Sequence, residues 1–148
     1  MSNIPDDAVA MFNSGYNCAQ SVLACCGAKF GLPRETAIKV AQAFGGGMGR
    51  SGSVCGAVTG ALMVIGLKHY VKDASDTAAK KEAGRLAQEF FKRFKARHKS
   101  LLCKELLGVD MSTDEGFRLA HSGPTKSICP TLIKDAAEII EDLLNSEK

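Results

Sequence analysis

The sequence has no apolar stretch long enough to cross a lipid bilayer. Its longest uncharged apolar run covers residues 54–67, only 14 residues, whereas a spanning helix needs about 20. We therefore expect no membrane insertion and interpret this run as a buried central helix. The first twelve residues also lack the basic segment and following apolar segment of a secretory signal, so we expect a cytoplasmic location.

Several signatures of enzymes are missing as well. The chain has no Cys-x-x-Cys motif, which is the usual mark of a thiol–disulfide enzyme, and no recognisable acid/base pair or catalytic triad. The glycine-rich stretch at 45–52 includes Arg50, but it follows a predicted helix rather than a strand and lacks the Lys-Ser/Thr ending of a nucleotide loop. We interpret this stretch as flexible backbone that lets Cys55 reach a site.

Strong charge of either sign is also absent, since the net charge is +3. One dense basic stretch occupies residues 92–99. Its aromatic residues follow helical spacing rather than the spacing of base stacking, so we interpret it as the solvated face of an amphipathic helix. A docking patch for an acidic redox partner is the alternative, and we expect no nucleic-acid binding.

Helical periodicity dominates the chain, and no segment shows the period-two alternation of a strand. Capping-box patterns at Asn17 with Gln20 and at Ser112 with Glu115 mark two helix starts. The main helices are predicted at 5–14, 18–30, 33–44, 53–67, 77–99 and 130–144, with short helical segments at 101–107 and 112–121. The sequence thus predicts an all-α fold: one domain over residues 1–148, a bundle of about six to seven helices around the buried central helix at 54–67.

Glycines inside the predicted central helix need a compensating reason. Gly56 and Gly60, with Ala57 and Ala61 beside them, form small-residue stripes at i, i+4 spacing. A glycine inside a helix costs about 1 kcal/mol relative to alanine. Ordinary close packing is one interpretation, and convergence of several helix ends on one small volume is the other.

The chain has six cysteines, and four of them lie where a helix is predicted to begin. They are Cys18, Cys55, Cys103 and Cys129. The positive end of a helix dipole favours a thiolate, and spaced cysteines in a reducing compartment indicate metal binding or redox chemistry rather than disulfides. Cys25 and Cys26 fall in mid-helix and are expected to be small buried side chains, with Cys25 as a spare or resolving thiol at most. His69, His98 and His121 are expected to have surface or packing roles.

The cysteines lie in sequence blocks that occur together in a known family. The blocks are GYNCAQ at 15–20, FGGGMG at 44–49 with CGAVTG at 55–60, CKELLG at 103–108, and CP at 129–130. This arrangement resembles the small redox proteins named for their C-GCAxxG-C-C pattern, and the likeness runs from about Gly15 to the last helix. The resemblance implies that Cys18, Cys55, Cys103 and Cys129 are the family cysteines. It also implies redox function, because similar domains in split-Soret cytochromes are associated with an iron-sulfur centre.

Four thiolates can hold a two-iron or four-iron sulfur cluster, or a tetrahedral zinc ion. A cluster with cysteine ligands is negatively charged, which suits the positive ends of helices. An iron-sulfur centre for electron transfer is therefore the leading hypothesis, with the four cysteines as its ligands. A metal-free thiol/disulfide protein, in which these cysteines are themselves redox-active, and a structural zinc protein are the alternatives. We expect an unidentified redox partner protein; whether the chain is an oxidoreductase or an electron-transfer component, and whether it forms a homodimer, stay open.

Overall fold

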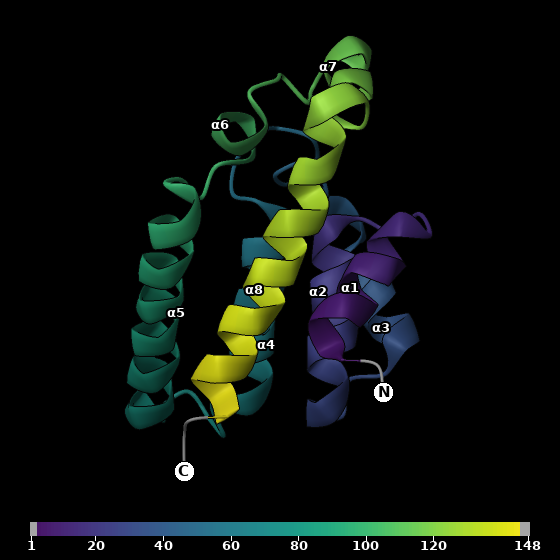
Figure 1. Ribbon diagram of the computed structural model, residues 1–148. Coiled ribbons are helices and arrows are strands. Elements are labelled where there is room, and N and C mark those ends of the chain that lie inside the picture. Colours follow the sequence, from purple (N-terminus) through teal and green to yellow (C-terminus); the bar gives the residue numbers. More distant parts are fainter. Residues whose placement is uncertain (1–2, 146–148) are drawn as a thin grey trace.

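The computed structural model describes residues 3–145, and all of its regular structure there is helical (Figure 1). The α-helices are α1 Ile4–Asn13, α2 Cys18–Gly27, α3 Arg34–Val40, α4 Gly56–Lys68, α5 Thr77–His98, α6 Cys103–Leu107, α7 Asp114–Ala120 and α8 Ile128–Asn145. Short 3-10 helices lie between some of them: η1 Ala28–Phe30, η2 Gln42–Phe44 and η3 Gly123–Ser127. The predicted all-α fold is confirmed.

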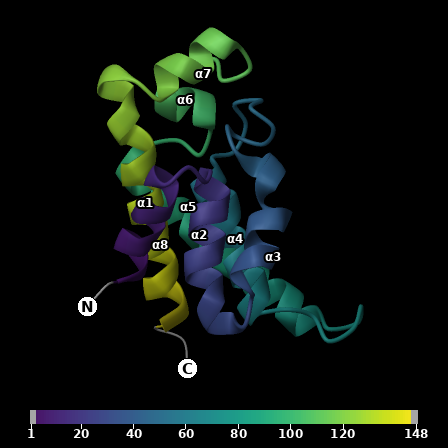
Figure 2. The same ribbon diagram turned by 90° about the vertical axis from the view of Figure 1, so that its right-hand side faces the viewer.

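Helix α4 lies at the centre of the bundle. It packs against α2, α8 and α5, while α1 packs against α2 and α8, and α3 covers the outer side of α2 (Figure 2). Small and branched apolar residues of α4 are almost fully buried, among them Ala57, Val58, Ala61 and Val64. The buried central helix expected from the sequence is therefore present.

The start of α4 differs from the prediction, which placed it at Ser53. Residues 53–55 are extended and run beside the segment that precedes α6. The backbone N–H of Cys55 donates to the carbonyl oxygen of Leu101 at 2.8 Å, and that of Cys103 donates to the carbonyl oxygen of Ser53 at 2.7 Å. Ser53 is therefore not an N-cap, because its backbone joins two loops. This junction places the N-termini of α4 and α6 side by side.

The glycines of α4 let it approach α2 at backbone distance. A Cβ atom on Gly56 would lie 2.9 Å from the backbone nitrogen of Ala19, and one on Gly60 would lie 3.0 Å from the carbonyl oxygen of the same residue. Both distances are shorter than normal packing contacts, so any side chain at these positions would push the helices apart. By contrast, a Cβ on Gly66 would meet nothing within 4 Å.

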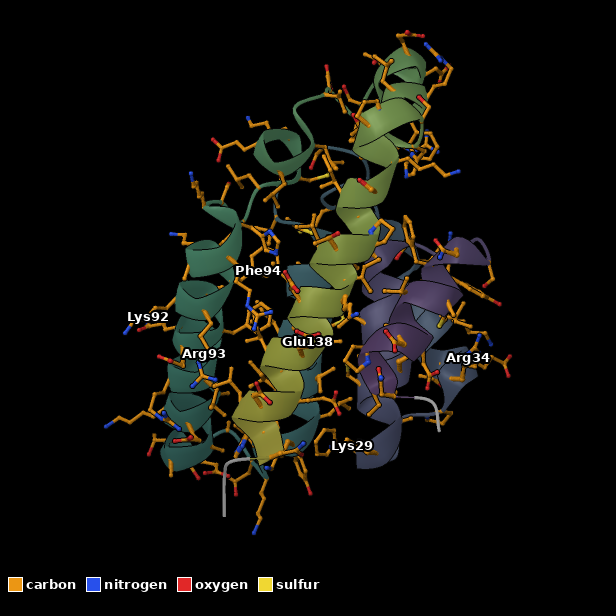
Figure 3. All side chains as sticks on the ribbon, viewed as in Figure 1. Lys29, Arg34, Lys92, Arg93, Phe94 and Glu138 are labelled. Atoms are coloured by element: carbon orange, nitrogen blue, oxygen red, sulfur yellow. The ribbon has the colours of Figure 1, made fainter. Side chains whose placement is uncertain are left out.

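Helix α5 is amphipathic, as predicted for the basic stretch at its C-terminal end. Phe94 is fully buried and points toward α8, whereas Lys92 points away from the molecule (Figure 3). Arg97 pairs with Asp135 of α8 at 3.2 Å. The basic stretch is thus a solvated face with one edge ion-paired to α8. Among the described helices, none has the length and apolar character of a membrane-spanning helix.

Helices α6, α7 and η3 form a small unit at one end of the bundle, which we call the cap (residues 103–127; Figure 1). A separate hydrophobic cluster holds it together. That cluster contains Cys103, Leu107, Met111, Ala120 and Cys129. Thr113, rather than the predicted Ser112, caps α7, since its hydroxyl accepts the backbone N–H of Gly116 at 2.9 Å. The cap thus has a small core that it shares with Cys129 of α8 and that is separate from the core of the bundle.

Candidate functional site

Four helix N-termini meet where the cap covers the bundle, and each carries one of the expected site cysteines. Cys18 and Cys103 are the first residues of α2 and α6, Cys129 is the second residue of α8, and Cys55 directly precedes α4. All four line one cavity of about 1040 Å³. Electrostatic interaction connects each of the six pairs of thiols, so the four side chains form one group.

Cys18 is fixed by the capping box that precedes it. The Asn17 side chain accepts the backbone N–H of Gln20 at 2.8 Å, and the Gln20 side chain accepts the backbone N–H of Asn17 at 2.9 Å. The amide of buried Gln20 also donates to the carbonyl oxygen of Ile38 at 2.9 Å and contacts the side chain of Gln42. The block GYNCAQ therefore orients Cys18, and its polar residues are used for that purpose.

Cys103 is held close to the glycine-rich loop. A Cβ on Gly47, whose φ is +70°, would lie 2.6 Å from the Cβ of Cys103 and 2.7 Å from the backbone nitrogen of Ser53. Only glycine fits this position, because the backbone is left-handed and has no room for a side chain. The loop is therefore closely packed structure around Cys103, whereas the sequence suggested flexible backbone serving Cys55.

The protonation of the four thiols is uneven. Cys18 donates a hydrogen bond to the sulfur of Cys129, which raises the pKa of Cys18 well above its usual value and lowers that of Cys129. Burial raises the pKa of Cys55 to about 12, although the backbone N–H groups of Ala57 and Val58 donate to its sulfur and act in the opposite direction. Burial also raises the pKa of Cys103 to about 11. In the absence of a bound cation, Cys129 is the thiol of this group that loses its proton most readily.

Zinc and iron-sulfur centres place different demands on the positions of four thiols. Within residues 3–145, no three histidine, cysteine, aspartate or glutamate side chains are arranged to share a single metal ion. A zinc site requires every sulfur to lie about 2.3 Å from one point. An iron-sulfur cluster makes a different demand, since each thiolate binds its own iron and the sulfurs stand further apart. In this protein four cysteine side chains line one cavity, and the backbone N–H groups of Ala57 and Val58 donate to the sulfur of Cys55.

Cationic and aromatic side chains surround the exposed mouth of the cavity. The guanidinium of Arg50 lies 3.7 Å from the ring centroid of Phe117, whose ring lies 4.5 Å from that of His121. Lys126 from η3 also lines the cavity. The sequence predicts only a surface or packing role for His121 and contains no signal for Phe117 or Lys126. Nothing local in the sequence marks them, because the cap brings them to the cysteines only after folding.

Cys25 and Cys26 lie elsewhere, as the sequence indicated. Cys26 is buried in the bundle core, where burial raises its pKa to about 12. Cys25 is partly buried and lines a separate, smaller pocket with Asp7 and Arg34. Neither side chain lines the cavity that the other four share.

Comparison with protein families finds that residues 16–143 match the family described as "Putative redox-active protein (C_GCAxxG_C_C)". The matched region contains all four cavity cysteines and nearly every helix. Comparisons with curated proteins and with solved structures find no significant match. Since the family match covers most of its length, the chain belongs to the C_GCAxxG_C_C family of redox-active proteins.

Proposed function

We propose that this protein transfers electrons through an iron-sulfur cluster held by Cys18, Cys55, Cys103 and Cys129. The observation that carries the proposal is the mutual interaction of all four thiols around one cavity, each at a different helix N-terminus. When bound, such a cluster supplies one-electron oxidation and reduction. The chain supplies its ligands, the electrostatic environment of the sulfurs and the cover over them.

Because the thiols are buried, they would need a bound cation to stay in the thiolate form. Ligation requires thiolates, yet burial raises the pKa of Cys55 and Cys103 far above neutrality. A positively charged cluster core offsets that cost, as do the helix N-termini that face the sulfurs. The N–H groups of Ala57 and Val58 that donate to Cys55 stabilise negative charge on its sulfur. Such donors raise the reduction potential of a cluster, because they favour the more negative reduced state.

A thiol/disulfide function is the second candidate, and the hydrogen bond between Cys18 and Cys129 favours it. The Cys129 thiolate would attack one sulfur of a disulfide on a partner protein, forming a mixed disulfide and releasing one thiolate. Attack by Cys18 on Cys129 would then form the Cys18–Cys129 bond and release the second partner sulfur. Two electrons and two protons pass to the partner, so one disulfide is reduced while another forms.

Either chemistry requires a redox partner, and we propose that this partner is a protein encountered in the cytoplasm. A reducing compartment keeps six cysteines as thiols, which both ligation and thiol exchange require. The cavity mouth is the approach route to the cysteines, because its Arg50 and Lys126 are exposed while Cys55, Cys103 and Cys129 are buried.

Purification without oxygen tests the two candidates against each other. We expect visible absorption together with iron and sulfide in matching amounts, and loss of both in Cys55→Ser. The control is Cys26→Ser, a buried cysteine outside the cavity, which should retain them. A metal-free protein that forms a Cys18–Cys129 disulfide in air would replace the first candidate with the second. Zinc alone, with no sulfide, would contradict both.

A further inference from the structure

The cavity extends well beyond the four sulfurs. Its volume of about 1040 Å³ is at the upper end of the range found for small-molecule sites, roughly 300–1000 Å³. The cysteines line its buried part, and the remaining wall reaches the exposed residues of the glycine-rich loop and the cap. There is room here for a molecule beside a metal centre or a reactive thiol.

The charges around this space have one sign. Apart from the cysteines and Tyr16, the titratable side chains that line the cavity are Arg50, His121 and Lys126, and no carboxylate among the described residues lines it. Apolar side chains complete the wall, including Phe12, Leu107 and Met111. A wall of this kind complements an anionic group attached to an apolar body.

Arg50 is positioned by an aromatic ring instead of a carboxylate. Its backbone φ is +61°, and its guanidinium lies over Phe117. Among residues 3–145, no hydrogen bond or ion pair occupies that guanidinium, whereas Arg118 on α7 is paired with Glu115. Stacking fixes the plane of a guanidinium and leaves its N–H donors at the edge. Arg50 therefore presents donors to the cavity without a partner that would neutralise them.

The ring of His121 is fixed in a similar way. It lies 4.5 Å from the ring of Phe117 and 6.4 Å from that of Phe12, measured between centroids. Its Nδ1 is 2.8 Å from the carbonyl oxygen of Phe117. A carbonyl can only accept, so Nδ1 carries the proton, and Nε2 is the nitrogen that a ligand can engage.

We infer that the cavity binds a small organic anion, with its acid group held by Arg50 and Lys126 and its apolar body against Phe12 and Met111. The inference rests on the proposed function, which it deepens by naming the class of small molecule that the cavity beside the cysteine centre takes. A carboxylate is the simplest such group, because it matches the two-pronged donor edge of an arginine. A phosphate ester shares this chemistry, and the experiment separates the two.

Titration calorimetry with three probes of similar shape tests the inference. Benzoate and phenyl phosphate carry the acid group, and benzamide is the neutral counterpart of benzoate. We expect benzoate to bind roughly tenfold more tightly than benzamide, as one charge-assisted contact with arginine supplies. Comparing benzoate with phenyl phosphate shows which acid the site prefers. Each titration uses the oxygen-free protein, followed by the same protein reduced and stripped of metal.

Two variants and a matched control make the test specific. Arg50→Gln and Lys126→Gln should each remove most of the preference for benzoate over benzamide. Arg118→Gln removes the same charge from an exposed arginine of the cap that does not line the cavity, so it should keep the preference. Helical circular dichroism checks that each variant is folded.

Equal binding of benzoate and benzamide, binding of neither, or equal loss in Arg118→Gln would overturn the inference. Iron and sulfide content, measured on the same samples, separates its failure from that of the proposed function. A protein that binds benzoate but holds no cluster contradicts only the cluster. A protein with a cluster and no anion binding contradicts only the inference.

Discussion

Two glycines of the central helix should respond in opposite ways to the same substitution. Gly60 and Gly66 both lie inside α4, so replacement by alanine gives each the same intrinsic gain in helix stability, about 1 kcal/mol. Their surroundings differ. The new methyl group at Gly66 would meet nothing within 4 Å, whereas the one at Gly60 would lie 3.0 Å from the carbonyl oxygen of Ala19 and 3.1 Å from the Cβ of Val22.

The magnitudes follow from this difference. Gly66→Ala should raise the free energy of unfolding by up to about 1 kcal/mol, which in a domain of this size raises Tm by about 2–4 °C. Gly60→Ala gains the same amount but also overpacks the contact with α2, at a cost of about 1–3 kcal/mol. The net effect is a decrease of about 0–2 kcal/mol in the free energy of unfolding. Backbone atoms of α2 cannot rotate away as a side-chain tip can, so the two helices must separate.

Thermal and urea unfolding of the metal-free, reduced protein measure these changes. Gly56→Ala belongs in the same series, since its methyl group would lie 3.1 Å from the Cβ of Cys18 and should lower cluster content as well as stability. The reasoning would be refuted if Gly60→Ala and Gly66→Ala stabilised the protein equally. Such a result would mean that α2 and α4 are not in backbone contact at Gly60.

Three further results are expected. In the metal-free, reduced protein, iodoacetamide should label Cys129 at lower pH than Cys55, because a lowered pKa gives more thiolate at a given pH. Cys18→Ala should shift the labelling of Cys129 to higher pH, because it removes the hydrogen-bond donor that lowers the pKa of Cys129. Peptide mass spectrometry of the labelled protein would show both effects. Cys25→Ser should leave iron and sulfide content unchanged, and loss equal to that in Cys55→Ser would show that the cysteines are wrongly divided. Thr113→Ala should cost about 1 kcal/mol by removing the N-cap of α7; faster hydrogen exchange confined to the cap would show it, and unchanged exchange would argue against it.

Features governed by neighbours in the sequence could be predicted from the sequence. The capping box at Asn17 forms as expected because both partners lie within one turn of helix. Asp76 caps α5 by its side chain alone, which accepts the backbone N–H of Ala79. The glycines of α4 predicted that some neighbouring backbone packs closely against that helix, since a glycine inside a helix otherwise weakens it; that α2 is this neighbour is shown only by the structure. Four cysteines at helix starts followed from the same local rules.

Features that depend on contacts between distant segments could not be predicted from the sequence. Ser53 has the side chain of an N-cap, but pairing of residues 53–55 with the segment before α6 delays the start of α4. The stacking of Arg50 on Phe117 joins a loop of the bundle to a helix of the cap. No periodicity or motif encodes that pairing, because it depends on where the cap packs.

The hydrogen bond between Cys18 and Cys129 also has a consequence for the unfolded chain. These residues are more than a hundred positions apart, so a covalent bond between them, or a cofactor bound to both, closes a loop containing every helix from α2 to α7. In the chain-entropy treatment, closing a loop of about 100 residues makes the unfolded state less favourable by about 4.7 kcal/mol. That is comparable to the whole stability of a small domain, about 5–15 kcal/mol. The redox state of this one sulfur pair would thus govern the stability of the protein as well as its chemistry.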